Sequence, residues 1–388
     1  MGERPLGCPS SDVDLWAEDV LADPYPTFAE LRETGPVVWL ERHGLVALPR
    51  HAEVAAALAD WRRFSSARGV GIDDGMNAAM GESPIASDPP AHDIYRKPLV
   101  EQLSSAALAG TAPYVGELAV RYAEAAVRAG SFDAVADLAR PFSLTVVGDL
   151  VGLRPDDRDA YPALAERAFN VFGPTGPRTA DGFLAVGEFI QRTLAAAEPG
   201  GLLPGGRGEQ LCRLGMPMML ITYTWPGIDT TVNALATAVL LFARHPEQWD
   251  ELRADRSLIP PAFNEVLRLH APVHYFTRHA TQDVDVAGVT LPAGTKVLVM
   301  YGSANRDERR FPDPDRFDIH RRADGHLAFG RGVHLCAGIH LARLEGHALL
   351  AALVDRVARF DLIAEPRWTL NNTLHGLASL HVQVVPAG

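Results

Sequence analysis

The chain has 388 residues, of which 47% are hydrophobic, and its formal net charge is −12 at pH 7. This hydrophobic content can fill a large core, while the acidic balance argues against nucleic acid as a general partner. There is no internal repeat, no stretch that approaches ~18 uncharged apolar residues, and no basic-then-apolar leader at the N-terminus. Three cysteines, Cys8, Cys212 and Cys336, make no disulfide framework. We therefore expect a cytoplasmic protein without a membrane anchor.

Helical periodicity dominates the chain. Apolar residues that recur every three or four positions predict helices at 24–34, 51–59, 106–129, 144–153, 156–169, 180–197 and about 216–244. Short apolar runs at 37–40 and 45–48 flank Gly44, the pattern of a hairpin, and strand-like segments return at 284–289, 296–299 and 380–385. A Gly- and Ser-rich loop is predicted at 65–88. The prediction is a mainly α fold with a small β portion, organised as a single domain over residues 1–388.

The most informative segment is Phe329-Gly330-Arg331-Gly332-Val333-His334-Leu335-Cys336-Ala337-Gly338. Its glycines allow a sharp turn and a close approach of the backbone to something flat, and a helical pattern follows at once. A position just before a helix favours a thiolate, because unpaired N–H groups and the helix dipole attract negative charge. A lone thiolate on such a loop is the proximal ligand that haem iron needs. The plain alternative is a buried, inert cysteine.

Asp229 and Thr230 lie in the middle of the long apolar helix, within Gly227-Ile228-Asp229-Thr230-Thr231. A buried charge at such a place is costly without partners. In one interpretation the threonine hydroxyls bond carbonyls one turn back, and Gly227 beside Pro226 kinks the helix. In the other, the same kink opens a groove over an iron centre that holds O₂ and a water, and Asp229 and Thr230 relay protons to it.

Glu265 and Arg268 are spaced i, i+3, which places an acid and a base on one face of a helix. As an exposed pair they would contribute only about a few tenths of a kcal/mol. The apolar neighbours Phe263, Val266 and Leu267 indicate burial instead. A buried Arg needs a complete set of acceptors.

These motifs follow one another in the order found in the cytochromes P450, and from end to end the chain resembles a soluble bacterial member of that family. The resemblance implies a mainly helical fold in which haem b is held between the central helix and the cysteine loop. It assigns these residues to the cofactor: Cys336 as the axial ligand of iron, Phe329, Gly330 and Gly338 in the haem-binding loop at 329–338, and His92, Arg96, Arg278 and His334 at the propionates, whose carboxylates suit Arg forks. For His92 and Arg96 the plain alternative is a solvated helix start.

The resemblance also gives Glu265 and Arg268 a structural role. The family's third partner is an arginine in a Pro-Asp-Arg-Phe segment, which residues 314–317 match. Arg316 should then complete the cluster that locks the cysteine loop. The Asp229–Thr230 pair corresponds to the acid–alcohol pair of the family's central helix, although Trp225-Pro226 replaces the small residues usually found there.

The implied activity inserts one atom of O₂ into an organic substrate. Electrons would come from NAD(P)H through a ferredoxin reductase and a ferredoxin. One alternative keeps the haem but performs oxidative coupling or rearrangement, as in natural-product tailoring. A third hypothesis is a haem-based gas sensor or electron carrier, against which the Asp229–Thr230 pair speaks, because a sensor has no need to deliver protons.

A finer resemblance concerns the bacterial P450 subfamily that demethylates para-methoxybenzoates. It rests on segments 66–71, 169–174, 302–307 and 371–374. The access loop at 65–88 lacks the polar residues that hold the benzoate carboxylate there, and Glu82 lies in that neighbourhood instead.

We expect four rings to line the substrate pocket. Phe169 and Phe172 are spaced i, i+3 and can point the same way, Trp225 comes from the central helix, and Phe276 comes from the segment after Glu-x-x-Arg. Ordinary core packing is the alternative for each ring. Converging rings favour flat aromatic substrates, and Glu82 would favour a hydroxyl or an amine over a carboxylate. The expected substrate is a compact aromatic molecule that undergoes O-demethylation or ring-substituent oxidation.

Overall fold

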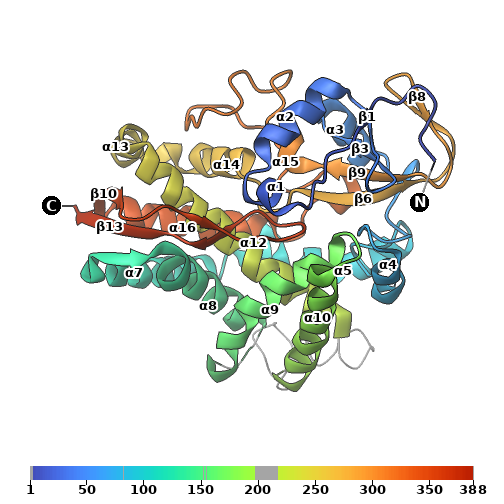
Figure 1. The fold of residues 1–388 in the computed structure, drawn as a ribbon. Coiled ribbons are helices and arrows are strands. Elements are labelled where there is room, and N and C mark those ends of the chain that lie inside the picture. Colours follow the sequence, from blue (N-terminus) through green and yellow to red (C-terminus); the bar gives the residue numbers. More distant parts are fainter. Residues whose placement is uncertain (1–2, 82, 152, 154, 197–216, 388) are drawn as a thin grey trace.

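The computed structural model describes the chain apart from residues 1–2, 82, 152, 154, 197–216 and 388 (Figure 1). The α-helices are α1 Glu18–Ala22, α2 Tyr25–Thr34, α3 His51–Ala59, α4 Asp74–Met80, α5 Ala91–Leu103, α6 Ser105–Leu108, α7 Ala112–Ala129, α8 Arg140–Val151, α9 Tyr161–Ala168, α10 Pro177–Ala196, α12 Pro217–Arg244, α13 Pro246–Ala254, α14 Ile259–Leu269, α15 Tyr301–Ala304 and α16 Ile339–Val354. One π-helix and four 3₁₀ turns join them within the described residues: η1 Ala134–Ala139, η2 Pro155–Ala160, η3 Phe169–Phe172, η4 Arg256–Leu258 and η5 Gly332–His334.

The largest sheet in the described part of the chain has six strands in the order β1-β2-β3-β9-β6-β4. These strands are β1 Ser10–Ser11, β2 Val38–Leu40, β3 Leu45–Leu48, β4 Phe64–Ser65, β6 Tyr275–Ala280 and β9 Lys296–Met300. β2 and β3 pair antiparallel with Trp39 opposite Val46, which confirms the predicted hairpin. β3 and β9 pair in parallel with Val46 opposite Val297, so this sheet joins segments that are far apart in the sequence.

The remaining strands form smaller sheets. β10 Val357–Leu362, β13 His381–Pro386 and β5 Ser131–Asp133 make a three-stranded sheet, and the pairs are β7 Val284–Val286 with β8 Val289–Leu291, and β11 Arg367–Trp368 with β12 Leu377–Ser379. The predicted strands at 284–289, 296–299 and 380–385 correspond to β7–β8, β9 and β13. The fold class, mainly helical with a small β portion, is confirmed.

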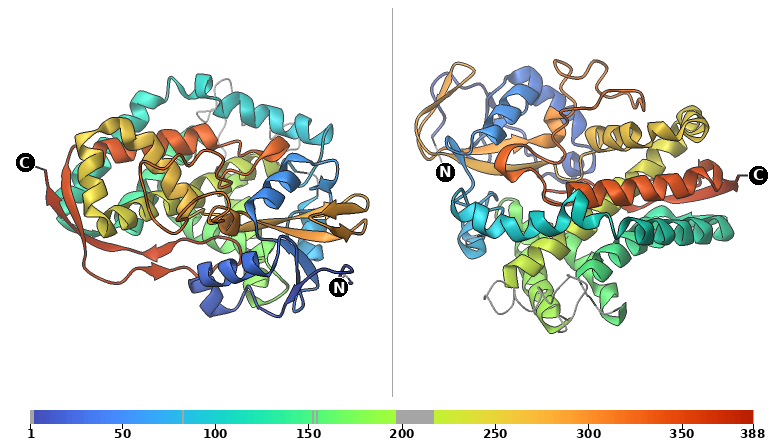
Figure 2. Two further views of the ribbon diagram at one scale, coloured as in Figure 1. Left: turned by 90° about the horizontal axis from the view of Figure 1, so that it is seen from above. Right: turned by 180° about the vertical axis from the view of Figure 1, so that it is seen from behind.

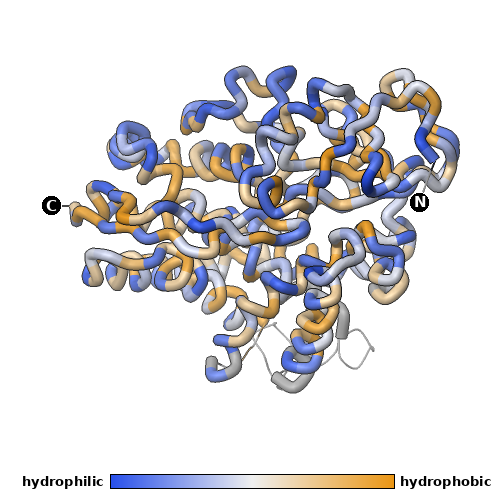
Figure 3. Tube along the Cα trace, viewed as in Figure 1, coloured by the Kyte–Doolittle hydropathy of each residue, from blue (hydrophilic) through white to orange (hydrophobic). Residues whose placement is uncertain are grey.

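Helix α12 runs through the middle of the molecule (Figures 1 and 2). It packs against α8, α9 and α10 on one side and against α14 and α16 on the other. Its segment Trp225–Arg244 is long and apolar enough to cross a bilayer, but 78% of the tested window is buried inside the fold. Burial against neighbouring helices therefore explains the apolar character of this segment. Figure 3 shows hydrophobic residues on α12 and the strands of the large sheet, and mostly hydrophilic residues on the long loop after α15.

Two local predictions need correction. The predicted helix at 106–129 is two helices, α6 and α7, because the chain breaks at Gly110 and Thr111 and Pro113 begins a new first turn. The access loop at 65–88 contains the helix α4, whose N-terminus is capped by Asp73: its carboxylate accepts a hydrogen bond from the backbone N–H of Met76. The strand β6 was not predicted from the sequence, although it carries two of the predicted site residues.

Candidate active site

The cysteine loop closes on itself immediately before α16. The backbone N–H of Cys336 donates to the carbonyl of Phe329 at 2.8 Å. Gly330 and Gly332 have φ values of 69° and 73°, in the left-handed region. A Cβ at Gly332 would lie 2.3 Å from the carbonyl oxygen of Leu58 on α3, so only glycine allows this approach. The tight turn predicted from the glycines is present, and it places Cys336 three residues before Ile339, where α16 begins.

The thiol of Cys336 has opposing influences on its pKa. Burial raises the pKa, while the backbone N–H of Gly338 and the positive charge of Arg96 lower it, and burial dominates. The start of a helix is therefore not sufficient by itself to make a thiolate here. A cation bound at the sulfur would stabilise the deprotonated form.

Four predicted propionate ligands converge beside this loop from separate segments. The rings of His92 on α5 and His334 in the cysteine loop lie 4.6 Å apart, edge to face. Burial and the charges of Arg278, His92 and Arg96 lower the pKa of His334 to about 2. Arg96 donates to the carbonyl of Leu335, and the buried Arg278 on β6 donates to the carbonyl of Thr277 at 2.8 Å.

The imidazoles of this cluster also leave hydrogen-bonding capacity unused. Nε2 of His92 and Nε2 of His334 are buried and have no hydrogen-bond partner among the described residues. Buried polar atoms normally have partners. Two free imidazole nitrogens beside two arginines fit a ligand with carboxylate groups, and the nearby thiol fits an iron that takes a sulfur ligand.

Thr230 and Asp229 have different environments on α12. The hydroxyl of Thr230 donates to the carbonyl of Pro226 at 2.7 Å, one turn back, so the back-bonding interpretation is confirmed for this residue. Asp229 is buried, and its Oδ2 lacks a hydrogen-bond partner within the described chain. Burial and the charge of Glu166 raise the pKa of Asp229 to about 8, against an opposing influence of Arg140. Glu166 and Arg140 could not be singled out from the sequence, because both belong to segments far from α12 in the chain.

The four predicted aromatic residues pack together. Phe169 and Phe172 occupy the 3₁₀ turn η3, whose i, i+3 residues eclipse one another. The ring of Trp225 lies 5.0 Å from Phe169 and stacks on Phe172 at 5.8 Å, and Phe276 lies edge to face with Phe172 at 5.1 Å. The indole N–H of Trp225 donates to the carbonyl of Ala165 at 3.1 Å, which fixes its orientation. Glu82, the polar residue predicted near this cluster, lies outside the described residues.

Glu265 and Arg268 form a fully buried ion pair, as the sequence predicted. Nε and Nη2 of Arg268 donate to the two carboxylate oxygens of Glu265 at 2.7 and 2.8 Å, and both side chains are 0% exposed. Nη1 of Arg268 donates to the carbonyls of Asn305 and Pro314 at 2.8 Å. The pair thus anchors the long loop between α15 and α16, which ends in the cysteine segment.

The prediction that Arg316 is the third partner of Glu265 and Arg268 is wrong. Its side chain is exposed, and its carbonyl accepts from Nη2 of Arg268 at 3.4 Å. Arg321 supplies the third side chain instead, with Nε 3.1 Å from the Glu265 carboxylate. The turn from Asp318 to Arg321 brings this arginine under the carboxylate, whose Oε1 also accepts from the backbone N–H of Asp318. The match to a short motif pointed to the wrong arginine because the turn after it was not visible in the spacing.

Glu345 is another acid that the sequence did not single out. It lies on α16, nine residues after Cys336, and is fully buried. Burial raises the pKa of its carboxyl well above the ordinary value, and neither carboxylate oxygen has a hydrogen-bond partner among the described residues. Its burial could have been predicted from the sequence, since this lone acid follows the apolar Leu341 and Leu344 on the same helix.

The chain is similar in sequence and in structure to known proteins. Residues 206–380 match the family model described as Cytochrome P450. Cytochrome p450 CYP199A2 of Rhodopseudomonas palustris is 39% identical over 99% of this chain and 97% of the relative. Linalool 8-monooxygenase of Pseudomonas putida is 31% identical over 96% of this chain and 98% of the relative. The crystal structure of CalO2 superposes with a TM-score of 0.83 at 28% identity, over 97% of this chain and 99% of that protein.

A mainly helical fold with a cysteine on a glycine loop, before a helix that packs on the long central helix, defines a haem-thiolate protein. The chain belongs to the cytochrome P450 family, and the family prediction is confirmed. The protein is a P450 monooxygenase, a class that uses O₂ and small-molecule substrates and whose cofactor is haem.

Proposed function

We propose that the protein hydroxylates or O-demethylates a compact aromatic substrate, with electrons delivered from NAD(P)H by a ferredoxin reductase and a ferredoxin. The observation that carries the substrate class is the cluster of Phe169, Phe172, Trp225 and Phe276, whose neighbouring centroids lie 5.0–6.0 Å apart. Rings held at these distances offer faces and edges to a flat ligand. Their side chains come from α12, β6 and η3, which also carry or adjoin the predicted relay and propionate residues.

In this proposal Cys336 would supply the sulfur ligand of the haem iron, and Phe329, Gly330 and Gly338 would form part of the loop that holds the haem. His92, Arg96, Arg278 and His334 would bind its propionates, and the two unpartnered Nε2 atoms support this assignment. Bound haem supplies the activation of O₂. The chain's own residues orient the substrate, exclude water and deliver protons.

Asp229 and Thr230 divide the proton delivery between them. The hydroxyl of Thr230 donates its hydrogen bond to the carbonyl of Pro226, so its oxygen can accept a hydrogen bond from a water and hold that water in place. Asp229 has a pKa of about 8 and keeps its proton at neutral pH. A carboxyl that titrates near the working pH is suited to repeated proton transfer.

The relay is tested by two substitutions. Thr230→Ala should leave NADPH consumption in place but lower product per NADPH severalfold, with hydrogen peroxide as the missing product, because the water is no longer held. Asp229→Asn should slow turnover by roughly 10²-fold, since an amide cannot release and regain a proton. Product, peroxide and NADPH are measured together in the reconstituted system. Wild-type coupling in Thr230→Ala together with wild-type rates in Asp229→Asn would contradict the relay.

The substrate class is tested by titration of the holoprotein. Uncharged methoxyarenes and amine-bearing aromatics should shift the haem spectrum from low to high spin, whereas 4-methoxybenzoate should give a smaller shift, because we expect Glu82 to repel its carboxylate. A full shift with 4-methoxybenzoate alone would contradict the role of Glu82, and no shift with any aromatic would contradict the aromatic pocket. Product analysis completes the test: one added oxygen or a lost methyl group is expected, while a coupled dimer would indicate oxidative coupling.

A further inference from the structure

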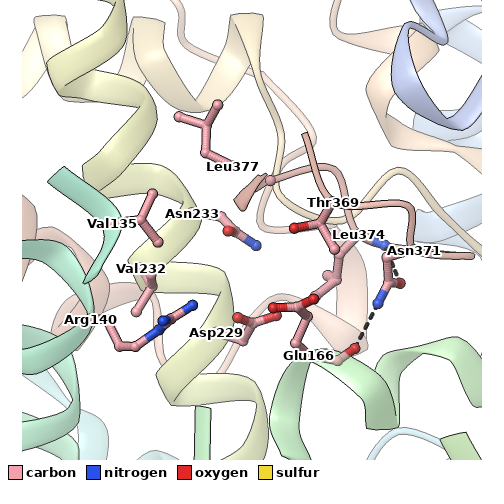
Figure 4. Close-up of a pocket in the computed structure, with 11 residues that line it drawn as sticks. Val135, Arg140, Glu166, Asp229, Val232, Asn233, Thr369, Asn371, Leu374 and Leu377 are labelled. Atoms are coloured by element: carbon pink, nitrogen blue, oxygen red, sulfur yellow. Dashed lines mark hydrogen bonds between the residues drawn. The ribbon is translucent and has the colours of Figure 1, made fainter. Parts of the chain in front are cut away.

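A polar cavity lies on the side of α12 that carries Asp229. Its polar lining consists of Arg140, Glu166, Asp229, Asn233, Thr369 and Asn371 (Figure 4). The carboxylates of Asp229 and Glu166 point toward one another in this view, and the Arg140 guanidinium points toward Asp229. The cavity has about 10 Å³ of room for the centre of a water molecule, which is enough for about one water. A water there can reach the unpartnered Oδ2 of Asp229.

The charges around this cavity favour one bound proton. Two carboxyls and one guanidinium face one another, so full ionisation would leave a net charge of −1 in a poorly hydrated place. Burial raises the pKa of Glu166, and the charge of Arg140 opposes this rise. Burial and the charge of Glu166 raise the pKa of Asp229. The charged neighbours that influence Asp229 are Glu166 and Arg140. Glu166 lies on α9 and Arg140 at the start of α8, and both helices pack against α12. The lining contributed by η1 and by residues 369–377 carries no charged side chain.

The lining residues differ in their access to solvent. Asp229, Asn233 and Asn371 are buried, whereas Arg140, Glu166 and Thr369 are partly exposed. Glu166 therefore lies between solvent and the buried acid. Its backbone is held on both sides: Nδ2 of Asn371 donates to the Glu166 carbonyl at 2.6 Å, and the adjacent Ala165 carbonyl accepts from Trp225.

We propose that Glu166 is a positioning residue that passes protons from solvent to Asp229 through a water in this cavity, with Arg140 setting the charge balance. The proposal rests on the function proposed above. In the transfer, the O–H bond of protonated Glu166 breaks as the water gains a proton, and the water gives a proton to the Asp229 carboxylate. Bulk water then reprotonates Glu166, so one proton enters for each one that Asp229 releases and no electron moves.

The decisive variant is Glu166→Gln, which keeps the shape but cannot carry a proton. Turnover with saturating reductase, ferredoxin and a high-spin-inducing aromatic should fall roughly tenfold. The solvent deuterium isotope effect on turnover should rise, and KM should stay unchanged, because none of the four rings proposed to bind the substrate lines the cavity. Glu166→Asp should recover part of the rate. Glu188→Gln, a change of the same type on the exposed face of α10, should behave like the wild type.

A readout without turnover tests the coupling of the two acids. The folded pKa of Asp229 is raised from 3.8 to about 8, so stability is lost as pH rises between these values. Removing the Glu166 charge should lower the pKa of Asp229. The loss of stability with rising pH should then end at a lower pH. The melting temperature of Glu166→Gln should therefore fall less than that of the wild type between about pH 6 and about pH 8.

The outcomes separate this inference from the proposed function. If Asp229→Asn slows turnover while Glu166→Gln matches Glu188→Gln in rate and isotope effect, the relay stands and the role of Glu166 is overturned. A slow Glu166→Gln with an unchanged isotope effect and no recovery in Glu166→Asp would show a merely structural role and also overturn it. If Glu166→Gln fails to fold, Glu166→Ala is assayed with added formate. Recovery of the rate by formate is expected, and its absence at full haem content contradicts the proposal.

Discussion

Cys336→Ser should abolish the carbon-monoxide absorbance band of the reduced holoprotein that gives the cytochromes P450 their name. The thiolate is the strong electron donor that produces this band, and a serine hydroxyl does not replace it. The geometry of the loop should survive, because the Cys336 N–H to Phe329 carbonyl hydrogen bond does not involve the side chain. The measurement is the reduced, carbon-monoxide-bound difference spectrum of purified protein, together with its haem content.

Cys8→Ser provides the matched control. Cys8 is also a free and buried cysteine, with a pKa raised by burial, but it belongs to the hydrophobic cluster that contains Val37 and Trp39. This variant should keep the full band. Retention of the band in Cys336→Ser, or its loss in Cys8→Ser, would contradict the ligand assignment.

Arg268→Ala should destabilise the protein by about 3–5 kcal/mol, because it leaves the Glu265 carboxylate charged and buried without its bidentate partner. Glu265 and Arg268 are 0% exposed, so water cannot substitute for the missing guanidinium. The loop that ends in the cysteine segment also loses its anchors at Asn305 and Pro314. Thermal unfolding and haem retention are the measurements.

Two further arginine variants test the composition of this cluster. Arg321→Ala should destabilise by roughly 1–3 kcal/mol, because it removes a hydrogen bond to a charged group from a side chain that is only 11% exposed. Arg316→Ala should stay within about 0.5 kcal/mol of the wild type, since the Arg316 side chain is exposed and the residue contacts Arg268 through its backbone carbonyl, which alanine keeps. If Arg316→Ala loses as much stability as Arg321→Ala, Arg316 would again be the third partner of Glu265, as the motif predicted.

Local features of the site followed from the sequence because short-range rules govern them. Glycine spacing predicted the turn before Cys336, and two glycines do adopt positive φ. The i, i+3 spacing predicted the contact of Glu265 with Arg268, and helical periodicity predicted α12 to within about one residue at its start. The hairpin of β2 and β3 followed from apolar runs around Gly44.

Contacts between distant segments were decided by the tertiary structure. The turn after Arg316 selects Arg321 as the partner of Glu265, although Arg316 is the arginine that lies in the Pro-Asp-Arg-Phe segment. Glu166 and Arg140 meet Asp229 because α8 and α9 pack on α12, and neither has a pattern that marks it in its own helix. The pKa of Asp229 depends on that meeting.

The family, the cysteine loop and the types of residue at the site could be predicted from short segments with fixed spacing. Which charges face one another, and how deeply each is buried, could not be predicted in this way. Burial and the distances between charges depend on how helices pack, and many side chains set that packing at once. Some of these side chains come from segments hundreds of residues apart, as with Trp16 and Asn372.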